Sequence, residues 1–195
     1  KRNQILVVSD LHLTAGRNPK SGTWSPTEDF FWDEDFADFL AHYGARGGWT
    51  LVVNGDLFDF LQVLERPTAE ECRVYGIPAG DRSRRYGLRA TEQAAVFQLD
   101  RIAEGHPAAF RALAEFLASG NRVIILKGNH DVQLFWPAVQ ARLRDRLKES
   151  VSAKKRAAVR ANLEILPWCF AIPGLLYCEH GNQYEAATSY AHFLH

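Results

Sequence analysis

The chain has little of several features that would point to particular classes of protein. Only three of its 195 residues are cysteines, and no two of them form a C-x-x-C pair. A disulfide framework is therefore excluded as the basis of the fold. No apolar run approaches the roughly 20 residues that span a bilayer. Residues 5–8 form an apolar run too short for the core of a signal peptide. We therefore expect a cytoplasmic protein with reduced thiols.

An excess of charge of either sign is also lacking. Lys plus Arg and Asp plus Glu both number 23, so the formal net charge is +0. Nothing in this balance requires nucleic acid or an acidic membrane as a partner. Hydrophobic residues make up 47% and charged residues 24%, which indicates a globular chain rather than a disordered one. At this length one domain with a sizeable core is expected, and there is no internal repeat.

What the chain does have is four short apolar runs that each end on residues suited to metal binding. These runs, bounded by Gly, Asn and Asp, predict buried strands at residues 5–8, 51–53, 123–126 and 175–178. The side chains that follow them, in chain order, are Asp10, His12, Asp56, Asn129 and His180. In open α/β sheets, ligands bind beyond the carboxyl ends of the strands. The sequence therefore predicts a metal centre at one edge of one sheet.

Helical patterns lie between these predicted strands. They cover a segment capped by Thr27 and closed by Gly44, and residues 92–103, 107–118, 132–149 and 153–161. Two further short strands are expected at residues 163–166 and 169–172, whereas residues 67–89 resemble an irregular insertion. Alternation of strands and helices favours an α/β layered sheet.

The predicted ligands have the chemistry of a centre that acts on phosphate esters. Asp10 and His12 are two residues apart, so at a strand end both can reach one ion. The two oxygens of the Asp56 carboxylate can bridge two ions. Oxygen and nitrogen ligands without thiolate suit Mn²⁺, Fe, Zn²⁺ or Mg²⁺. Two such ions can hold an attacking hydroxide and stabilise the entering and leaving oxygens of a displacement at phosphorus. His130 could then protonate the leaving group, with Asp59 orienting its ring.

Taken together, these motifs resemble a known family signature. The D-x-H triplet at 10–12, G-D-x-x-D at 55–59, G-N-H-D at 128–131 and the later His180 are similar to those of calcineurin-like metallophosphoesterases. The resemblance implies a four-layer α/β/β/α sandwich and two divalent metal ions, with Mn²⁺ the first expectation. It also implies roles for particular residues: Asp10, His12 and Asp56 on the first metal, Asp56, Asn129 and His180 on the second, and His130 with Asp59 as the leaving-group acid.

The chain departs from the family pattern in two ways. Family members usually close with a G-H-x-H motif, which these 195 residues lack. We therefore expect residues 1–195 to be a metallophosphoesterase domain that lacks its C-terminal segment and carries a helical insertion around residues 65–120. Asp59 is followed by Phe60-Leu61 rather than by the Arg-Gly of Ser/Thr protein phosphatases. The motif sequences S-D-L-H-L at 9–13 and G-D-L-F-D at 55–59 are more similar to those of UDP-2,3-diacylglucosamine diphosphatase, although those enzymes usually carry Arg at the position of His130.

The sequence thus favours a hydrolase acting on a phosphorylated small molecule or a lipid-linked substrate, with peripheral membrane contact left open. One alternative is a non-catalytic module of the same fold that uses the site for binding. Another is a nuclease, for which a basic cluster in the insertion (Arg82, Arg84, Arg85 and Arg89) would form the groove. We favour a solvated loop for this cluster, because no interleaved aromatics suggest base stacking. His42 and His106 belong to no motif and are expected to be incidental.

Overall fold

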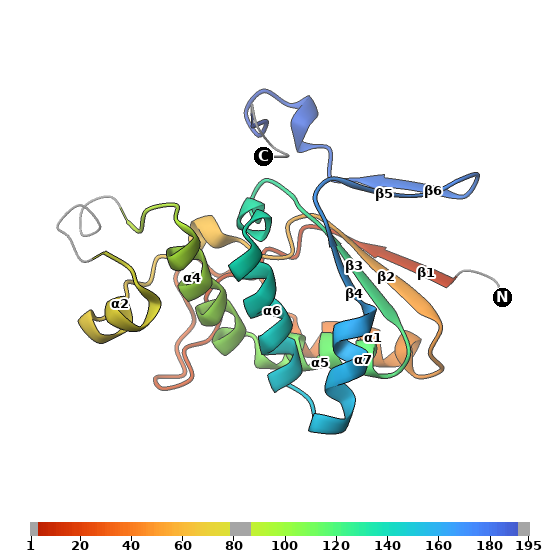
Figure 1. Ribbon diagram of the computed structural model, residues 1–195, viewed down its shortest axis with the longest axis horizontal. Helices are drawn as coiled ribbons and strands as arrows, with labels where there is room; N and C mark the ends of the chain where they lie inside the picture. Colours follow the sequence, from red (N-terminus) through yellow and green to blue (C-terminus); the bar gives the residue numbers. More distant parts are fainter. Residues whose placement is uncertain (1–3, 79–86, 191–195) are drawn as a thin grey trace.

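A four-stranded parallel sheet forms the centre of the computed structural model, which describes residues 4–78 and 87–190 (Figure 1). Its strands are β1 (Gln4–Val8), β2 (Trp49–Asn54), β3 (Arg122–Leu126) and β4 (Leu163–Leu166), in the order β1-β2-β3-β4. The parallel register pairs Val8 with Val53 and Asn54 with Leu126. The carboxyl ends of the strands therefore lie at one edge, as the sequence predicts.

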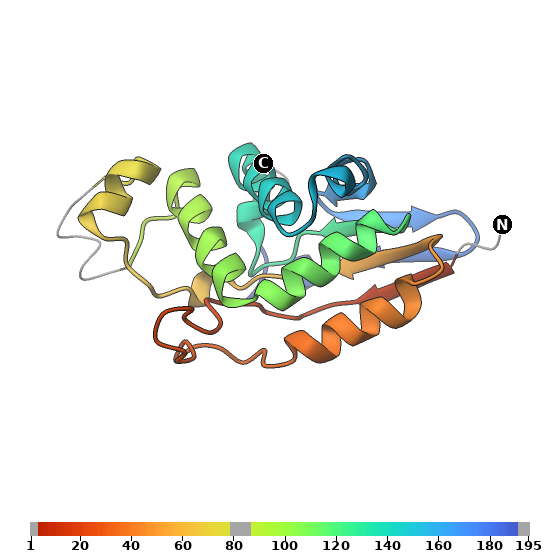
Figure 2. The ribbon, with the colours of Figure 1, turned by 90° about the horizontal axis from the view of Figure 1, so that it is seen from below.

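The helices gather on one face of this sheet (Figure 2). Strands that follow one another in sequential order have this consequence, because right-handed crossovers place every connection on the same side. The main helices are α1 (Asp33–Gly44), α4 (Glu92–Gly105), α5 (Pro107–Ala118), α6 (Pro137–Glu149) and α7 (Arg156–Asn162). Alternate strand residues such as Leu51, Val53 and Ile125 pack into the large core beneath them. The helices predicted at residues 92–103 and 107–118 are confirmed.

An antiparallel hairpin covers the opposite face of the sheet. It consists of β5 (Cys169–Ile172) and β6 (Leu176–Glu179), the latter one residue later than predicted. A smaller core of Val52, Ile124, Leu126 and Cys178 lies on this side. The predicted α/β class is therefore confirmed, and the described residues show a helical layer and two layers of strands.

The insertion contains a short helix where the sequence analysis expects irregular structure. Helix α2 (Ala69–Tyr75) begins with a capping box in which the Thr68 side chain accepts from the Glu71 N–H and the Glu71 carboxylate accepts from the Thr68 N–H. This reciprocal pair satisfies two backbone donors at the helix start. The expectation of an irregular segment is wrong here, although the S/T-x-x-E pattern of a capping box is present in the sequence at Thr68 and Glu71.

The first helix also begins later than predicted, at Asp33 rather than next to Thr27. The Thr27 hydroxyl donates to the carbonyl oxygen of Gln62 instead of capping a helix. Glu28, which would fall in the first turn of that predicted helix, is buried with its carboxylate turned inward. Residues 132–149, expected to be one helix, divide into the 3-10 helix η2 (Val132–Phe135) and α6, because Pro137 starts a new helix.

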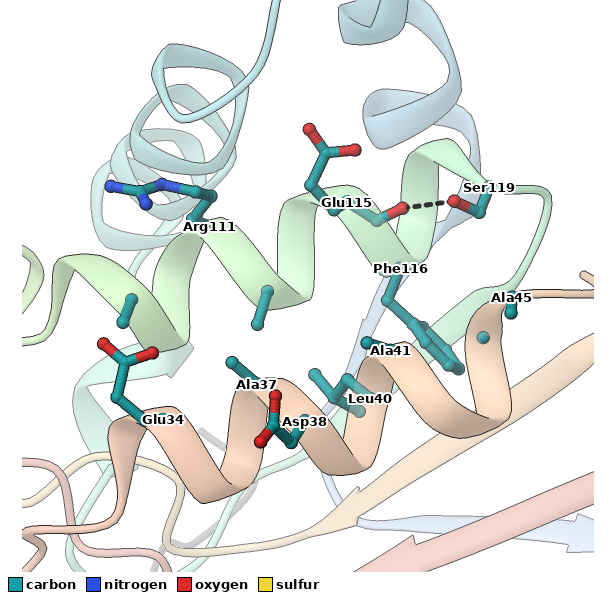
Figure 3. Close-up of a pocket in the computed structure, with 13 residues that line it drawn as sticks. Glu34, Ala37, Asp38, Leu40, Ala41, Ala45, Arg111, Glu115, Phe116 and Ser119 are labelled. Carbon is teal, nitrogen blue, oxygen red and sulfur yellow. Dashed lines mark hydrogen bonds between the residues drawn. The ribbon is translucent and has the colours of Figure 1, made fainter.

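The remaining short 3-10 helices are η1 (Phe60–Gln62), η3 (Ala153–Lys155) and η4 (Asn182–Tyr184). Helices α1 and α5 lie side by side, and a groove of about 410 Å³ runs between them (Figure 3). Small side chains such as Ala37, Ala41 and Ala112 line it, so the two helices approach closely. This groove belongs to the helical layer and holds none of the predicted ligands. Within the described residues, no helix has the length and apolarity needed to cross a membrane.

Candidate metal centre

The five side chains predicted as metal ligands converge around the carboxylate of Asp56. Its Oδ2 atom lies 3.2 Å from His180 Nε2 and 3.7 Å from His12 Nε2. His12 Nε2 is in turn 3.8 Å from Asp10 Oδ1, and His180 Nε2 is 3.1 Å from Asn129 Oδ1. The ligands come from four segments of the chain that the parallel sheet and the hairpin bring to one edge.

Four of these ligands, together with His130, form two overlapping groups that are close enough to hold a metal ion. One group is His12, Asp56 and His130, and the other is Asp10, Asp56 and His180; within each, ligand atoms lie within 4.8 Å of one another. Asp56 belongs to both. The grouping differs from the partition that the family resemblance implies in two ways: His130, the expected acid, lies with His12 and Asp56, and Asp10 lies with His180.

The backbone that carries three of these side chains is strained. Asp10, His12 and Asp56 have φ angles of 55°, 51° and 53°, and they are the non-glycine residues with positive φ in the described part of the chain. Such conformations cost roughly 1–3 kcal/mol each and persist only where the surrounding structure enforces them. Here the His12 N–H donates to the Asp56 carbonyl oxygen at 3.0 Å, which holds the two strand-end loops together. Strain concentrated on the predicted ligands indicates a functional constraint.

Two motif glycines leave room for the ligands. A Cβ atom on Gly55 would lie 2.4 Å from His180 Nδ1, and one on Gly128 would lie 2.0 Å from Asp56 Oδ1. Either contact would displace a ligand side chain. The glycines of the G-D-x-x-D and G-N-H-D motifs are thus required by the close packing of one motif against another.

His180 is oriented so that one ring nitrogen faces the centre. Its Nδ1 atom lies 2.9 Å from the carbonyl oxygen of Asn54, which can only accept, so Nδ1 carries a proton. Nε2 then points at oxygen atoms of Asp56 and Asn129. The role of Asn54 is not predicted from the sequence, because a backbone carbonyl leaves no signature in the side-chain pattern.

The electrostatics of the centre favour a cation. The hydrogen bond with Asp56 raises the pKa of His180 to about 9, although burial opposes this. Burial tends to raise the pKa of Asp56, but the bonds from His180 and from the backbone N–H of His130 outweigh it and leave the pKa lowered. Without a metal, the His180 ring therefore needs a proton on Nε2 as well as on Nδ1 to lie against the surrounding oxygen atoms. A divalent ion would meet the same oxygens and the ring nitrogen without that proton, so this donor set fits a metal of the Mn²⁺, Fe, Zn²⁺ or Mg²⁺ type.

A second pair, His130 and Asp59, lies beside these ligands. Asp59 Oδ2 is 2.8 Å from His130 Nδ1 and 3.4 Å from His12 Nδ1, so one carboxylate orients both rings. The other oxygen, Oδ1, accepts from the N–H of Gln62 at 3.1 Å and fixes the buried carboxylate in place. Since Nδ1 of His130 is engaged, Nε2 is the atom able to exchange a proton with a substrate. The expected proximity of these two side chains is observed.

Asp131 supports the centre from behind. It is fully buried and accepts from the N–H groups of Gly128 at 2.6 Å and Leu57 at 3.0 Å, which joins two motif loops. Burial, with a contribution from the nearby charge of Asp56, raises the pKa of Asp131 to about 7. Glu179, the other acidic neighbour of a ligand, instead bonds to Trp168 and Tyr177 outside the centre. Tyr190, which no motif indicates, donates to the Asn129 carbonyl oxygen at 2.9 Å.

A separate buried cluster surrounds His106, which the sequence analysis expects to be incidental. Its Nε2 lies 3.0 Å from Glu28 Oε2 and its Nδ1 lies 2.9 Å from Asp33 Oδ2, with the histidine side chain fully buried. Glu28 also accepts from the Gly16 N–H at 2.7 Å and from the Thr14 hydroxyl. The expectation for His106 is therefore wrong. This residue anchors the loop that follows Asp10 and His12 to the junction of α4 and α5.

The fold and the site together define the class of protein. It is an α/β protein in which carboxylates and imidazoles at the strand ends form a candidate metal-binding site. The chain belongs to the calcineurin-like phosphoesterase family, whose model matches residues 4–194. This confirms the family resemblance, and membership indicates metal-dependent hydrolysis of phosphate esters. No curated protein and no solved structure gives a significant match. The nearer resemblance to UDP-2,3-diacylglucosamine diphosphatase stays a prediction.

Proposed function

We propose that the chain is a phosphoesterase that works with two divalent cations at the carboxyl edge of its sheet. The observation that carries the proposal is the position of Asp56, whose carboxylate is shared by both candidate ligand groups. A carboxylate with two oxygens at the centre of two ligand sets is the arrangement that a two-ion site needs.

In this proposal each ion has its own ligands besides Asp56. Asp10 and His12 would hold one ion, and Asn129 and His180 the other, with Asp10 also within reach of the second. Mn²⁺ is the first candidate, and Fe, Zn²⁺ and Mg²⁺ suit the same mixture of oxygen and nitrogen donors. When bound, such ions neutralise charge on the phosphate oxygens and lower the pKa of a nearby water molecule.

His130 is the proposed acid for the leaving group. The Asp59 carboxylate accepts from Nδ1 of His130 and fixes the orientation of the ring, so Nε2 would be the atom that transfers the proton. As the bond between phosphorus and the leaving oxygen breaks, this proton passes to the oxygen and the alcohol departs neutral. The same carboxylate holds the His12 ring, so Asp59 couples the acid to the metal ligands.

The substrate is proposed to be a phosphorylated small molecule or a lipid-linked phosphate ester. Of the basic cluster that would support a nuclease, Arg82, Arg84 and Arg85 lie outside the described residues, whereas Arg89 lines a pocket beside η1.

The test is hydrolysis of an aryl phosphate and an aryl phosphodiester by the chain, first stripped of metal with a chelator and then supplied with Mn²⁺. We expect no turnover of the stripped chain and restored turnover with Mn²⁺. A chain that binds Mn²⁺ but hydrolyses neither ester would instead be the non-catalytic module. Failure to bind any divalent ion would contradict both readings of the centre.

A further inference from the structure

The chain that leaves the metal centre at His180 returns to it at Tyr190. Gly181, with a φ angle of 96°, turns the chain into η4. The loop is then closed by two bonds: the Asn182 amide donates to the Thr188 carbonyl oxygen at 3.1 Å, and the Thr188 hydroxyl donates to the Asn182 carbonyl oxygen at 2.9 Å. These two bonds hold the ends of the loop together, directly beside His180 on one side and Tyr190 on the other.

Both flanks of this loop contact the same predicted ligand, Asn129. Nε2 of His180 lies 3.1 Å from the amide oxygen of Asn129, and the Tyr190 hydroxyl donates to its main-chain carbonyl oxygen at 2.9 Å. Burial and the nearby charge of Asp56 raise the pKa of Tyr190, so the hydroxyl stays protonated at neutral pH and able to donate. Tyr190 is thus placed to act on the backbone of a ligand.

The bond from Tyr190 fixes a peptide unit that is also bound to the shared carboxylate. The carbonyl of Asn129 and the N–H of His130 belong to one planar peptide group. Its N–H donates to Asp56 Oδ1 at 2.9 Å and its carbonyl accepts from Tyr190, so the group is held on both sides. Hydrogen bonds arranged in such a series strengthen one another. Because the plane of this peptide sets ψ of Asn129, it also limits where the Asn129 side chain can lie.

The neighbouring backbone groups of this motif loop are fixed in the same way. The Gly128 N–H donates to Asp131 at 2.6 Å, and the His130 carbonyl oxygen accepts from the Phe60 N–H at 3.2 Å. Between them, the Asn129 carbonyl is held by a side chain from another segment. Its amide oxygen must also face the centre, since the amide nitrogen of asparagine only donates and cannot bind a cation. Loss of the bond from Tyr190 would loosen the residue for which direction matters most.

We propose that Tyr190 is a positioning residue of the metal centre: its hydroxyl holds the main chain of Asn129, so that the amide oxygen of this residue stays beside His180. The inference rests on the proposed function, in which Asn129 and His180 hold one of two cations. Tyr190 then determines how tightly this one cation is bound. Groups that orient a metal ligand change metal affinity by about 10–100-fold when they are removed.

Calorimetric titration of the metal-free chain with Mn²⁺, without substrate, tests this inference. We expect the wild type to bind two ions, and Tyr190→Phe, which keeps the ring and removes the hydroxyl, to bind one of them about 10–100-fold more weakly. The matched control is Tyr184→Phe in the same loop, whose hydroxyl bonds to Glu179 outside the centre. It should leave both affinities unchanged. Wild-type affinity in Tyr190→Phe, or an equal loss in the two variants, would overturn the inference.

A double-mutant cycle separates positioning from a direct contact with the ion or a loss of structure. Asn129→Ala removes the amide but keeps the main-chain carbonyl that Tyr190 holds. If Tyr190 acts through that amide, adding Tyr190→Phe to Asn129→Ala should weaken Mn²⁺ binding no further. A further loss by the same factor in the double variant would show that Tyr190 acts by another route and is not a positioning residue for Asn129.

Turnover of an aryl phosphate separates this inference from the proposed function. Tyr190→Phe should need more Mn²⁺ for half-maximal turnover, by the factor by which its affinity falls. A loss of turnover that added Mn²⁺ does not restore would indicate contact with the substrate and contradict the positioning role. If no ester is hydrolysed but one ion is weakened as expected, the inference stands and the phosphoesterase proposal fails. If esters are hydrolysed and Tyr190→Phe binds Mn²⁺ as the wild type does, only the inference fails.

Discussion

Imidazoles meet carboxylates at two places in the described part of the chain, and the two places differ in how well their acceptors are matched by protons. In the cluster around His106, each ring nitrogen faces one carboxylate, from Glu28 and Asp33, and the ring is fully buried. In the metal centre, two imidazoles, those of His12 and His180, approach the same oxygen of Asp56, and further oxygens surround them. The first cluster is complete in itself, because a ring protonated on both nitrogens donates one hydrogen bond to each of its two partners. The second has more acceptors at one point than its own protons can satisfy.

The backbone conformation also distinguishes the two places. The metal centre holds the strained residues Asp10, His12 and Asp56, whereas neither His106 nor its carboxylate partners have positive φ angles. Strain together with an excess of acceptors distinguishes a site prepared for a ligand from an ion pair that only stabilises the fold. Burial and a raised pKa do not make this distinction by themselves, since the pKa of both His106 and His180 is raised to about 9.

The largest expected effect comes from Asp56→Asn. Removing the shared carboxylate should weaken metal binding by more than the ~10–100-fold loss seen when a group that only orients a ligand is mutated. Turnover of an aryl phosphate should fall with it, even at saturating substrate. The control is Asp33→Asn in the His106 cluster, which should keep metal and turnover at temperatures where the chain is folded. Equal losses of metal in the two variants would remove the distinction between the clusters.

Within the metal centre, His130→Ala should separate proton transfer from metal binding. We expect a loss of about 10²–10⁴-fold in kcat for an alkyl phosphate, whose leaving group needs a proton, and a much smaller loss for a nitrophenyl phosphate. The bound metal, measured by elemental analysis, should stay close to that of the wild type. If kcat falls by the same factor for both esters, His130 does not act as the acid.

In the other cluster, Glu28→Gln should act on stability and leave the chemistry intact. It leaves a buried imidazole with one charged partner instead of two, and breaking a buried ion pair costs about 3–5 kcal/mol. Urea unfolding should show this loss, while metal affinity of the folded variant changes little. A stable variant that has lost its metal would mean that the Glu28 contact with the loop after His12 is part of the site.

The pH dependence of unfolding should give the smallest effect. Burial lowers the pKa of His106, but its bonds to Asp33 and Glu28 outweigh this and raise it to about 9. The stabilisation is therefore complete below about pH 6.5, the ordinary pKa, and is lost as pH rises towards 9. Burial raises the pKa of Glu28, but bonds from His106 and Thr14 outweigh this and lower it to about 2, so its contribution is lost as pH falls below about 4.5.

Comparison with His106→Gln isolates the histidine from other groups, including His180, whose raised pKa gives metal-free protein the same alkaline trend. The difference in unfolding free energy between wild type and this variant should shrink between pH 6.5 and 9. A constant difference over this range would show that His106 does not gain a proton on folding.

The sequence predicts the centre better than it predicts the elements around it. Strand-end positions put Asp10, Asp56 and Asn129 at one edge, because strand direction in a parallel sheet decides where side chains meet. The contact between Glu28 and His106 joins residues 78 positions apart and leaves no local pattern in the sequence. Because this contact holds Glu28 outside a helix, the start of α1 at Asp33 is not predicted either. The Asn54 carbonyl and the Tyr190 hydroxyl act through backbone contacts, which side-chain motifs do not encode. The capping box of α2, by contrast, is local and readable from Thr68 and Glu71.

The central claim is that Asp56 lies between two cations, and the magnetic coupling between bound Mn²⁺ ions tests it most directly. Metal-free chain titrated with Mn²⁺ and followed by electron paramagnetic resonance should take up two ions per chain and show the exchange coupling of neighbouring ions. Asp56→Asn should abolish the coupling, whereas Asp33→Asn should keep it. Uptake of a single uncoupled ion by the wild type, or coupling that survives in Asp56→Asn, would contradict the claim.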